Sequence, residues 1–141
     1  MMHTSCIDTI NGPVVTVRGA AAFEMLEMVY VGKKRLIGEV IAVSAAATTI
    51  QVYESTTGLH PGEPVEGTGA PLCATLGPGI LQNIFDGIER PLRAMSDATG
   101  AFISVGFAIS PLDPDAVWDV TVTAAVGDKL TGGAVYATCP E

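Results

Sequence analysis

The chain has 141 residues, of which 48% are hydrophobic and only 16% are charged, and this composition excludes intrinsic disorder. Its 15 acidic and 7 basic residues give a net charge of −8, so it lacks the basic surface that binds nucleic acid or anionic membranes. The length fits one domain or two small ones, and 16 glycines with 9 prolines spread along the chain favour short strands over a helical bundle.

Residues 5–55 are predicted to form β-structure. The pair Asn11-Gly12 is a turn signal that precedes the first of these strands. The basic run Lys33-Lys34-Arg35 separates two alternating segments, which indicates a hairpin with a solvated tip. Strands are expected at residues 13–17, 27–31, 36–43 and 49–54. Their short, regular spacing indicates a small closed barrel, because closure leaves no unpaired edge.

Residues 55–79 are rich in glycine and proline and are predicted to be a loop-rich connector. Two short strands are expected inside it, near Glu63–Glu66 and Leu72–Leu76. Residues 80–88 are the predicted helix, because five hydrophobic residues there fall at helical spacing. The sequence of residues 91–100 favours neither helix nor strand.

The last segment, residues 101–141, is predicted to return to β-structure, with strands at 101–109, 117–122 and 134–138. Neither a signal peptide nor an apolar stretch of about 20 residues is recognisable, so a soluble, cytoplasmic protein is expected. The three cysteines are far apart, which argues against a disulfide framework and for a reducing compartment.

The titratable residues form no recognisable catalytic or metal-binding pattern. His3 and His60 have no second ligand type at a useful spacing, and the aspartates within residues 113–119 lack the pattern of a calcium-binding loop. Glu39 lies in an apolar strand, where burial would raise its pKa, although such a residue more often faces solvent outside a barrel. No catalytic, cofactor-binding or metal-ligating residue is therefore predicted.

Residues 127–134 begin like a P-loop, but Gly133 and Ala134 stand where a lysine and a serine or threonine must contact phosphate and Mg²⁺. A strand, rather than the helix that a P-loop needs, is expected to come next. The same segment resembles half of the motif of biotinyl and lipoyl carrier domains, but Lys129 lies in the wrong turn for modification. An unrelated small barrel that serves as a binding module or carrier domain is the alternative hypothesis.

A series of blocks carries a stronger resemblance. In chain order they are Val29–Gly32, Leu36–Ile41, Ile50–Leu59, Pro61–Val65, Thr68–Leu72, Leu76–Leu81 and Ile84–Leu92. Their order and spacing resemble those of the catalytic A subunit, or alpha chain, of V-type and archaeal-type rotary ATPases. Residues 11–15 are similar to the N-terminal strand of that family and residues 118–141 to the start of its insertion, so the resemblance covers nearly the whole chain.

The resemblance implies three parts. Residues 1–72 would be the N-terminal β-barrel, residues 73–100 a connector into the nucleotide-binding domain, and residues 101–141 the start of the insertion, also called the bulge or non-homologous region. Family members are several times longer, and their P-loop and catalytic glutamate lie beyond this sequence. The chain is therefore expected to be an inactive N-terminal fragment of an ATP hydrolase or synthase, with MgATP bound only by the full-length protein.

The resemblance also implies partners. Barrels of the family form a crown on a ring of six alternating A and B subunits, and the insertion would meet the peripheral stalk. ATP turnover in the family is coupled to transport of H⁺ or Na⁺. Such contacts require exposed apolar patches on the isolated chain, which is expected to lie in the ATPase head, peripheral to the membrane and without direct contact to it.

Overall fold

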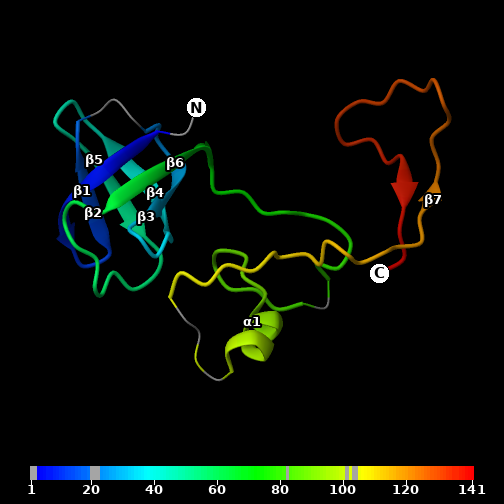
Figure 1. Ribbon diagram of the computed structural model, residues 1–141. Helices are drawn as coiled ribbons and strands as arrows, with labels where there is room; N and C mark the ends of the chain where they lie inside the picture. Colours follow the sequence, from blue (N-terminus) through cyan, green and yellow to red (C-terminus); the bar gives the residue numbers. More distant parts are fainter. Residues whose placement is uncertain (1–2, 20–22, 82, 101, 103–104) are drawn as a thin grey trace.

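The structure is a computed structural model that describes residues 3–19, 23–81, 83–100, 102 and 105–141. The strands and the helix are β1 (Thr4–Asn11), β2 (Val14–Arg18), β3 (Glu27–Val31), β4 (Leu36–Val43), β5 (Ala47–Val52), β6 (Pro64–Pro71), α1 (Leu92–Thr99), β7 (Thr121–Val122) and β8 (Ala137–Thr138). Figure 1 shows a barrel at one end, a connector (residues 73–100) that contains α1, and an arm (residues 112–141) that carries β7 and β8.

Strands β1 to β6 form a closed barrel, as the sequence predicts. The strand order is β1-β2-β5-β4-β3-β6, and all pairs are antiparallel. Strand β6 closes the barrel, because Val65 lies opposite Ser5 of β1 on one side and opposite Val31 of β3 on the other. Every barrel strand therefore has two hydrogen-bonded neighbours.

The hydrophobic core fills the barrel interior. It arises from the alternation of the strands: in β3 and in the first five residues of β4, every second residue is buried and the ones between them are partly exposed. The buried cluster consists of Ile7, Val15, Val17, Phe23, Val29, Val31, Leu36, Val40, Ile50, Val52 and Val65. Seven of these eleven are valines, whose β-branched side chains suit the narrow interior of a small barrel.

The seam between β3 and β6 holds a buried carboxylate. The Oε1 atom of Glu27 accepts the N–H of Gly69 at 2.8 Å, and its Oε2 accepts the N–H of Glu24 at 2.8 Å. These two bonds offset the cost of burying the side chain. A Cβ at Gly67 would collide with Glu27 Oε1 and lie 3.1 Å from the ring of Phe23. Close packing therefore requires glycine at position 67.

The structure contradicts the helix predicted at residues 80–88. The described residues there form turns and an isolated bridge, and the helix begins only at Leu92, in the segment that favoured neither state. The cause is Asp86, whose carboxylate accepts the N–H groups of Ile88 and Arg90. Those donors are then not available to a helical ladder.

Several predicted strands are shorter or absent. Residues 72–76 form no strand, and the predicted strands at 117–122 and 134–138 shrink to β7 and β8. Within 101–109, residues 101, 103 and 104 lie outside the described part, and the described residues there form no strand. In the described part of the chain, β7 and β8 pair only with each other and at two positions, and residues 72–76 pair with no strand, so an apolar sequence alone did not suffice to form longer strands.

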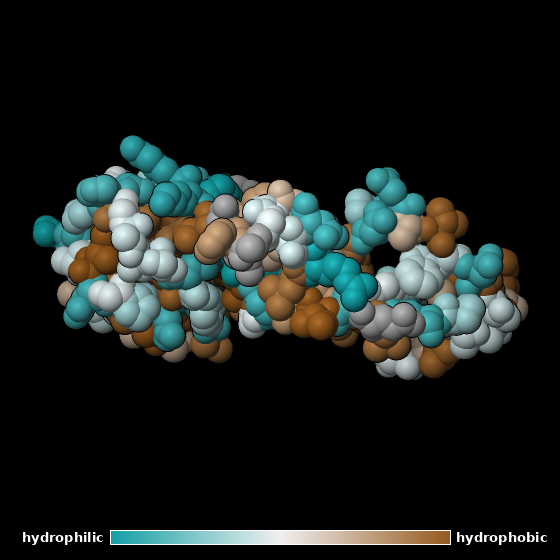
Figure 2. Space-filling view, turned by 90° about the horizontal axis from the view of Figure 1, so that it is seen from below, coloured by the Kyte–Doolittle hydropathy of each residue, from teal (hydrophilic) through white to brown (hydrophobic). Residues whose placement is uncertain are grey.

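Large hydrophobic side chains are exposed along the connector and the arm, as expected. Figure 2 shows apolar residues at the surface of both the barrel end and the arm end of the chain. Those of the arm include Val117, Val126 and Val135, each more than two-thirds exposed. Helix α1 has eight residues, and no helix in the described part of the chain has the length and apolar character needed to cross a membrane.

We expect Gly67→Ala to lower the free energy of unfolding by about 1–3 kcal/mol, because the added methyl group must displace the Glu27 carboxylate or the Phe23 ring. Urea denaturation followed by circular dichroism measures this change. Gly132→Ala is the control, since a Cβ there meets no atom within 4 Å. Equal stability of the two variants would contradict the packing argument.

Candidate functional site

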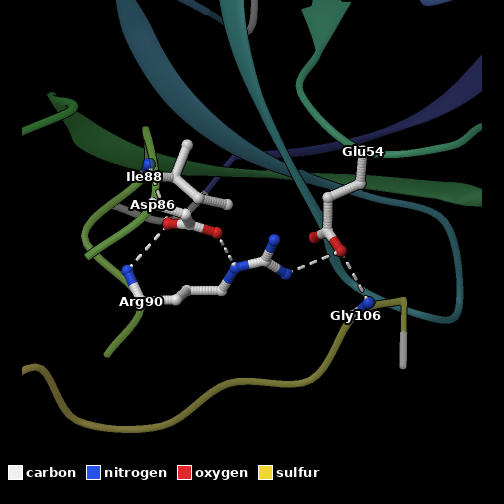
Figure 3. Close-up of polar contacts among 5 residues, drawn as sticks. All are labelled: Glu54, Asp86, Ile88, Arg90 and Gly106. Atoms are coloured by element: carbon white, nitrogen blue, oxygen red, sulfur yellow. Dashed lines mark hydrogen bonds and ion pairs between the residues drawn. The ribbon is translucent and has the colours of Figure 1, made fainter. Parts of the chain in front are cut away.

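The most connected polar cluster in the described residues joins the barrel to the connector through Arg90 (Figure 3). The guanidinium donates from Nη1 to Glu54 Oε2 at 2.9 Å and from Nε to Asp86 Oδ2 at 2.6 Å. Glu54 follows β5 at one end of the barrel, whereas Asp86 and Arg90 lie in the loop before α1. One cation therefore bridges a barrel carboxylate and a connector carboxylate; we call these three residues the Arg90 clamp.

The loop before α1 is shaped by its own backbone. The N–H of Leu92 donates to the carbonyl of Ile84 at 2.9 Å, and the N–H of Asp86 donates to that of Arg90 at 3.1 Å. Between these bonds the chain reverses direction, and Glu89 takes the left-handed conformation with φ 62°. The resulting tight loop directs the Arg90 side chain toward the barrel, as Figure 3 shows.

Burial strengthens the clamp. The side chains of Arg90 and Glu54 are only 15% and 8% exposed. Burial by itself would raise the pKa of Asp86, but the N–H of Arg90, its guanidinium and the N–H of Ile88 outweigh that effect and hold the pKa below its usual value. Burial would likewise lower the pKa of Arg90, and its hydrogen bond to Asp86 and the charge of Glu54 raise it instead.

The barrel carboxylate holds a second segment as well. Glu54 Oε2 also accepts the N–H of Gly106 at 2.9 Å. Gly106 has φ +73°, and a Cβ at this position would collide with the carbonyl oxygen of Lys34 at the β3–β4 turn. Glycine is thus required here both by its backbone conformation and by the close approach of the two segments.

A cavity of about 460 Å³ lies beside the clamp, between the barrel wall and the connector. Its barrel side is the outer face of β3 and β4, including Tyr30 and Ile37. The guanidinium of Arg35 lies 4.1 Å from the ring centre of Tyr30 and also pairs with Glu66. Residues of the connector and of segment 106–111 form the opposite side.

The chemistry of the clamp is that of attachment. An arginine stays protonated in proteins and presents a planar fork of donors, which suits simultaneous binding of two carboxylates. Asp86, with its lowered pKa, remains a carboxylate that accepts hydrogen bonds rather than an acid that donates a proton. The cluster can therefore fix the position of the connector on the barrel wall.

The residues considered from sequence lie outside this cluster. His3 and His60 are exposed, and His60 Nδ1 lies 3.3 Å from Glu63 Oε1. Glu39 lies on the outer face of β4 and accepts the hydroxyl of Tyr53 at 2.8 Å, which is the first cause of the raised pKa of Tyr53. The exposed tip Lys33-Lys34-Arg35 lies in the turn predicted for it.

Asp113 and Asp115 belong to a turn, in which Asp113 Oδ1 accepts the N–H of Asp115 at 2.9 Å, whereas Asp119 is exposed in the segment that follows. Residues 127–134 form turns that lead into β8, and Lys129 is exposed there. Among the described residues, no group of three or more His, Cys, Asp or Glu side chains is arranged to hold a metal ion.

Sequence reasoning missed the Arg90 clamp. Glu54 and Arg90 are 36 positions apart, so no local spacing links them. The available signal was weaker: both residues are charged in a chain with only 16% charged residues, and both stand in blocks that carried the family resemblance. Their pairing depends on how the connector folds back along the barrel, which local patterns do not determine.

The comparison with protein families finds one match. Residues 7–69 match the β-barrel domain of the ATP synthase alpha/beta family. The matched range covers most of the six barrel strands, from within β1 to within β6.

Similar proteins extend the match beyond the barrel. The chain is 52% identical over 132 residues to the V-type ATP synthase alpha chain of Halothermothrix orenii, which covers 94% of this chain and 22% of that protein. It is 45% identical over 138 residues to the A subunit of the A-type ATP synthase of Halobacterium salinarum, and this match covers 98% of this chain and 23% of that protein. The chain thus spans less than a quarter of the length of these relatives.

The clamp predicts energetic coupling between Glu54 and Arg90. We expect Arg90→Met to destabilise the chain by about 2–3 kcal/mol, because it leaves two partly buried carboxylates without their cation. In a double-mutant cycle with Glu54→Gln, measured by urea denaturation, the coupling should be about 1–3 kcal/mol. Arg93→Met, at an exposed arginine of α1, is the matched control. Additive effects of the two clamp substitutions would exclude the coupling.

The lowered pKa of Asp86 predicts a dependence of stability on pH. Its carboxylate contributes fully above the ordinary pKa of 3.8, and this contribution is lost as the pH falls through the lower value of the folded chain. Between about pH 5 and pH 2, the wild type should therefore lose more stability than Asp86→Asn. Urea denaturation at each pH provides the measurement, and parallel curves for the two proteins would refute the prediction.

Proposed function

We propose that the chain is the N-terminal part of the catalytic A subunit of a V-type or archaeal-type rotary ATPase, because residues 7–69 match the β-barrel domain of the ATP synthase alpha/beta family and the similarity to A and alpha chains continues beyond them. The observation that carries the proposal is the 45–52% identity to such A and alpha chains over at least 94% of this chain. A barrel of unrelated origin would not share the sequence beyond the barrel as well.

The proposed organisation has three parts. Residues 1–72 are the barrel, residues 73–100 lead into a nucleotide-binding domain, and residues 101–141 begin the insertion. ATP hydrolysis or synthesis, with its coupling to H⁺ or Na⁺ transport, belongs to the downstream domain. This chain therefore binds no nucleotide by itself, and MgATP is bound by the full-length protein.

The barrel has a mechanical role in this proposal. Together with the barrels of neighbouring B subunits it forms the crown of an alternating ring of six. A closed barrel with a continuous core suits this role, because close-packed interiors resist deformation. The crown can then keep its shape while the catalytic domains change theirs during turnover.

The Arg90 clamp gives the barrel a firm attachment to the connector. The ion pair between Arg90 and Glu54 holds the connector against the barrel wall, and the ion pair between Arg90 and Asp86 fixes the guanidinium within the connector loop. The bond from Gly106 to Glu54 holds the segment after the connector against the same wall. We propose that forces on the downstream domain reach the crown through this attachment as well as through the covalent chain. The arm, which carries exposed apolar residues, is the proposed contact to the peripheral stalk. The head of the complex would then lie on the cytoplasmic side, away from the membrane.

The crown proposal is tested in the full-length protein. Removing residues 4–71 should abolish assembly of the ring with the B subunits, because the barrels supply the contacts at that end. Native mass spectrometry of the two purified proteins measures the assembly. Normal rings without the barrel would refute the mechanical role.

Nucleotide binding is the control for this deletion. Calorimetry with MgATP should detect binding to the shortened protein, which shows that the catalytic domain is folded. The same titration of the 141-residue chain should detect none, and a clear Mg²⁺-dependent affinity would contradict the proposed division of labour.

A further inference from the structure

A second carboxylate attachment involves none of the residues of the Arg90 clamp. The Oε1 atom of Glu141 accepts the N–H of Gly79 at 2.8 Å and the N–H of Leu81 at 2.7 Å. These partners are about 60 positions apart in the sequence, so the bonds connect the two sides of a long excursion of the chain. Hydrogen bonds from backbone N–H groups to a charged carboxylate oxygen are stronger than hydrogen bonds between neutral groups.

The loop that binds Glu141 also packs against the segment where the arm begins. A Cβ at Gly77 would lie 2.9 Å from Leu112, and a Cβ at Gly79 would lie 3.2 Å from the ring of Trp118. Gly79 also has φ +96°, so its lack of a side chain serves both the backbone conformation and the close approach of Trp118. Trp118 and Glu141 further line one cavity of about 370 Å³, together with Gly79, Leu81, Asn83 and Arg93.

We infer that the loop of residues 77–81 is a carboxylate-binding clasp for Glu141, which fastens both ends of the arm, residues 112–141, to one place on the connector. Leu112 and Trp118 hold the outgoing chain by packing, and Glu141 holds the returning chain by charge-assisted hydrogen bonds. In Figure 1 the two ends of the arm lie close together, with the C-terminal end beside the start of the arm.

The arm needs such a fastening. Its own ladder consists of the two-residue strands β7 and β8, with only two paired positions. A two-stranded hairpin of this kind is at best marginally stable in water. The clasp restricts the motion of the C-terminal end of the arm where it meets the connector. It therefore defines the direction in which residues 119–140 project.

The clasp is tested by amide hydrogen exchange measured by NMR. In the wild type, the N–H groups of Gly79 and Leu81 should be protected and their proton resonances shifted downfield. In Glu141→Ala both amides should exchange about tenfold faster, the change expected for losing bonds to a charged acceptor. Glu141→Gln retains an acceptor and should give intermediate protection. Acrylamide quenching of Trp118, the single tryptophan, should increase in the alanine variant.

Asp119→Asn is the matched control, because it neutralises an exposed acidic residue of the same arm that is no part of the clasp. Its Gly79 and Leu81 amides should exchange as in the wild type. Unchanged barrel resonances verify that each variant is folded. Equal exchange of these amides in the wild type and Glu141→Ala would overturn the inference, and so would an equal loss of protection in Asp119→Asn.

Discussion

The pairing of β6 with both β1 and β3 is the constraint on which the rest of the structure depends. It closes the barrel around one valine-rich core and leaves no unpaired edge among the six strands. The closing seam also demands the unusual packing of Gly67 against the buried Glu27 carboxylate. Because the chain leaves the barrel from β6, the same strand sets where the connector starts and allows Arg90 to reach Glu54 on the barrel.

The acidic residues of this chain have a structural role that its net charge alone does not indicate. Among the described residues, eight carboxylates accept backbone N–H groups outside regular ladders. The acceptors are Glu27, Glu54, Glu63, Asp86, Glu89, Asp113, Asp128 and Glu141. A glycine- and proline-rich chain has many loops whose N–H groups find no partner in a ladder, and a carboxylate satisfies one or two of them at once. The excess of acidic over basic residues thus fits a protein whose loops are fastened by its side chains.

The barrel strands were predictable because they alternate hydrophobic and outward-facing residues, and each buried position has a partner strand within the next few dozen residues. The helix was predicted in the wrong segment, since the spacing of hydrophobic residues at 80–88 was correct for a helix but Asp86 captured two of the N–H groups. The pairing of residues in the Arg90 clamp could not be predicted from local sequence patterns. Its members acquire their roles only when distant segments fold together, and an isolated charged residue in the sequence looks the same whether it is solvated or paired.

The contrast between the barrel and the arm supports a division of mechanical labour. Eleven side chains form one continuous core in the barrel, whereas the arm has exposed valines and a two-residue ladder. A body with a continuous core keeps its shape under load, while a segment with few buried contacts takes its shape from the groups that hold its ends. In this chain charged groups hold the parts together at two places: Arg90 of the connector pairs with Glu54 of the barrel, and Glu141 binds the backbone at the base of the arm. Charge-assisted bonds are directional in a way that apolar contacts are not, so they can fix how the parts are oriented without a large shared core.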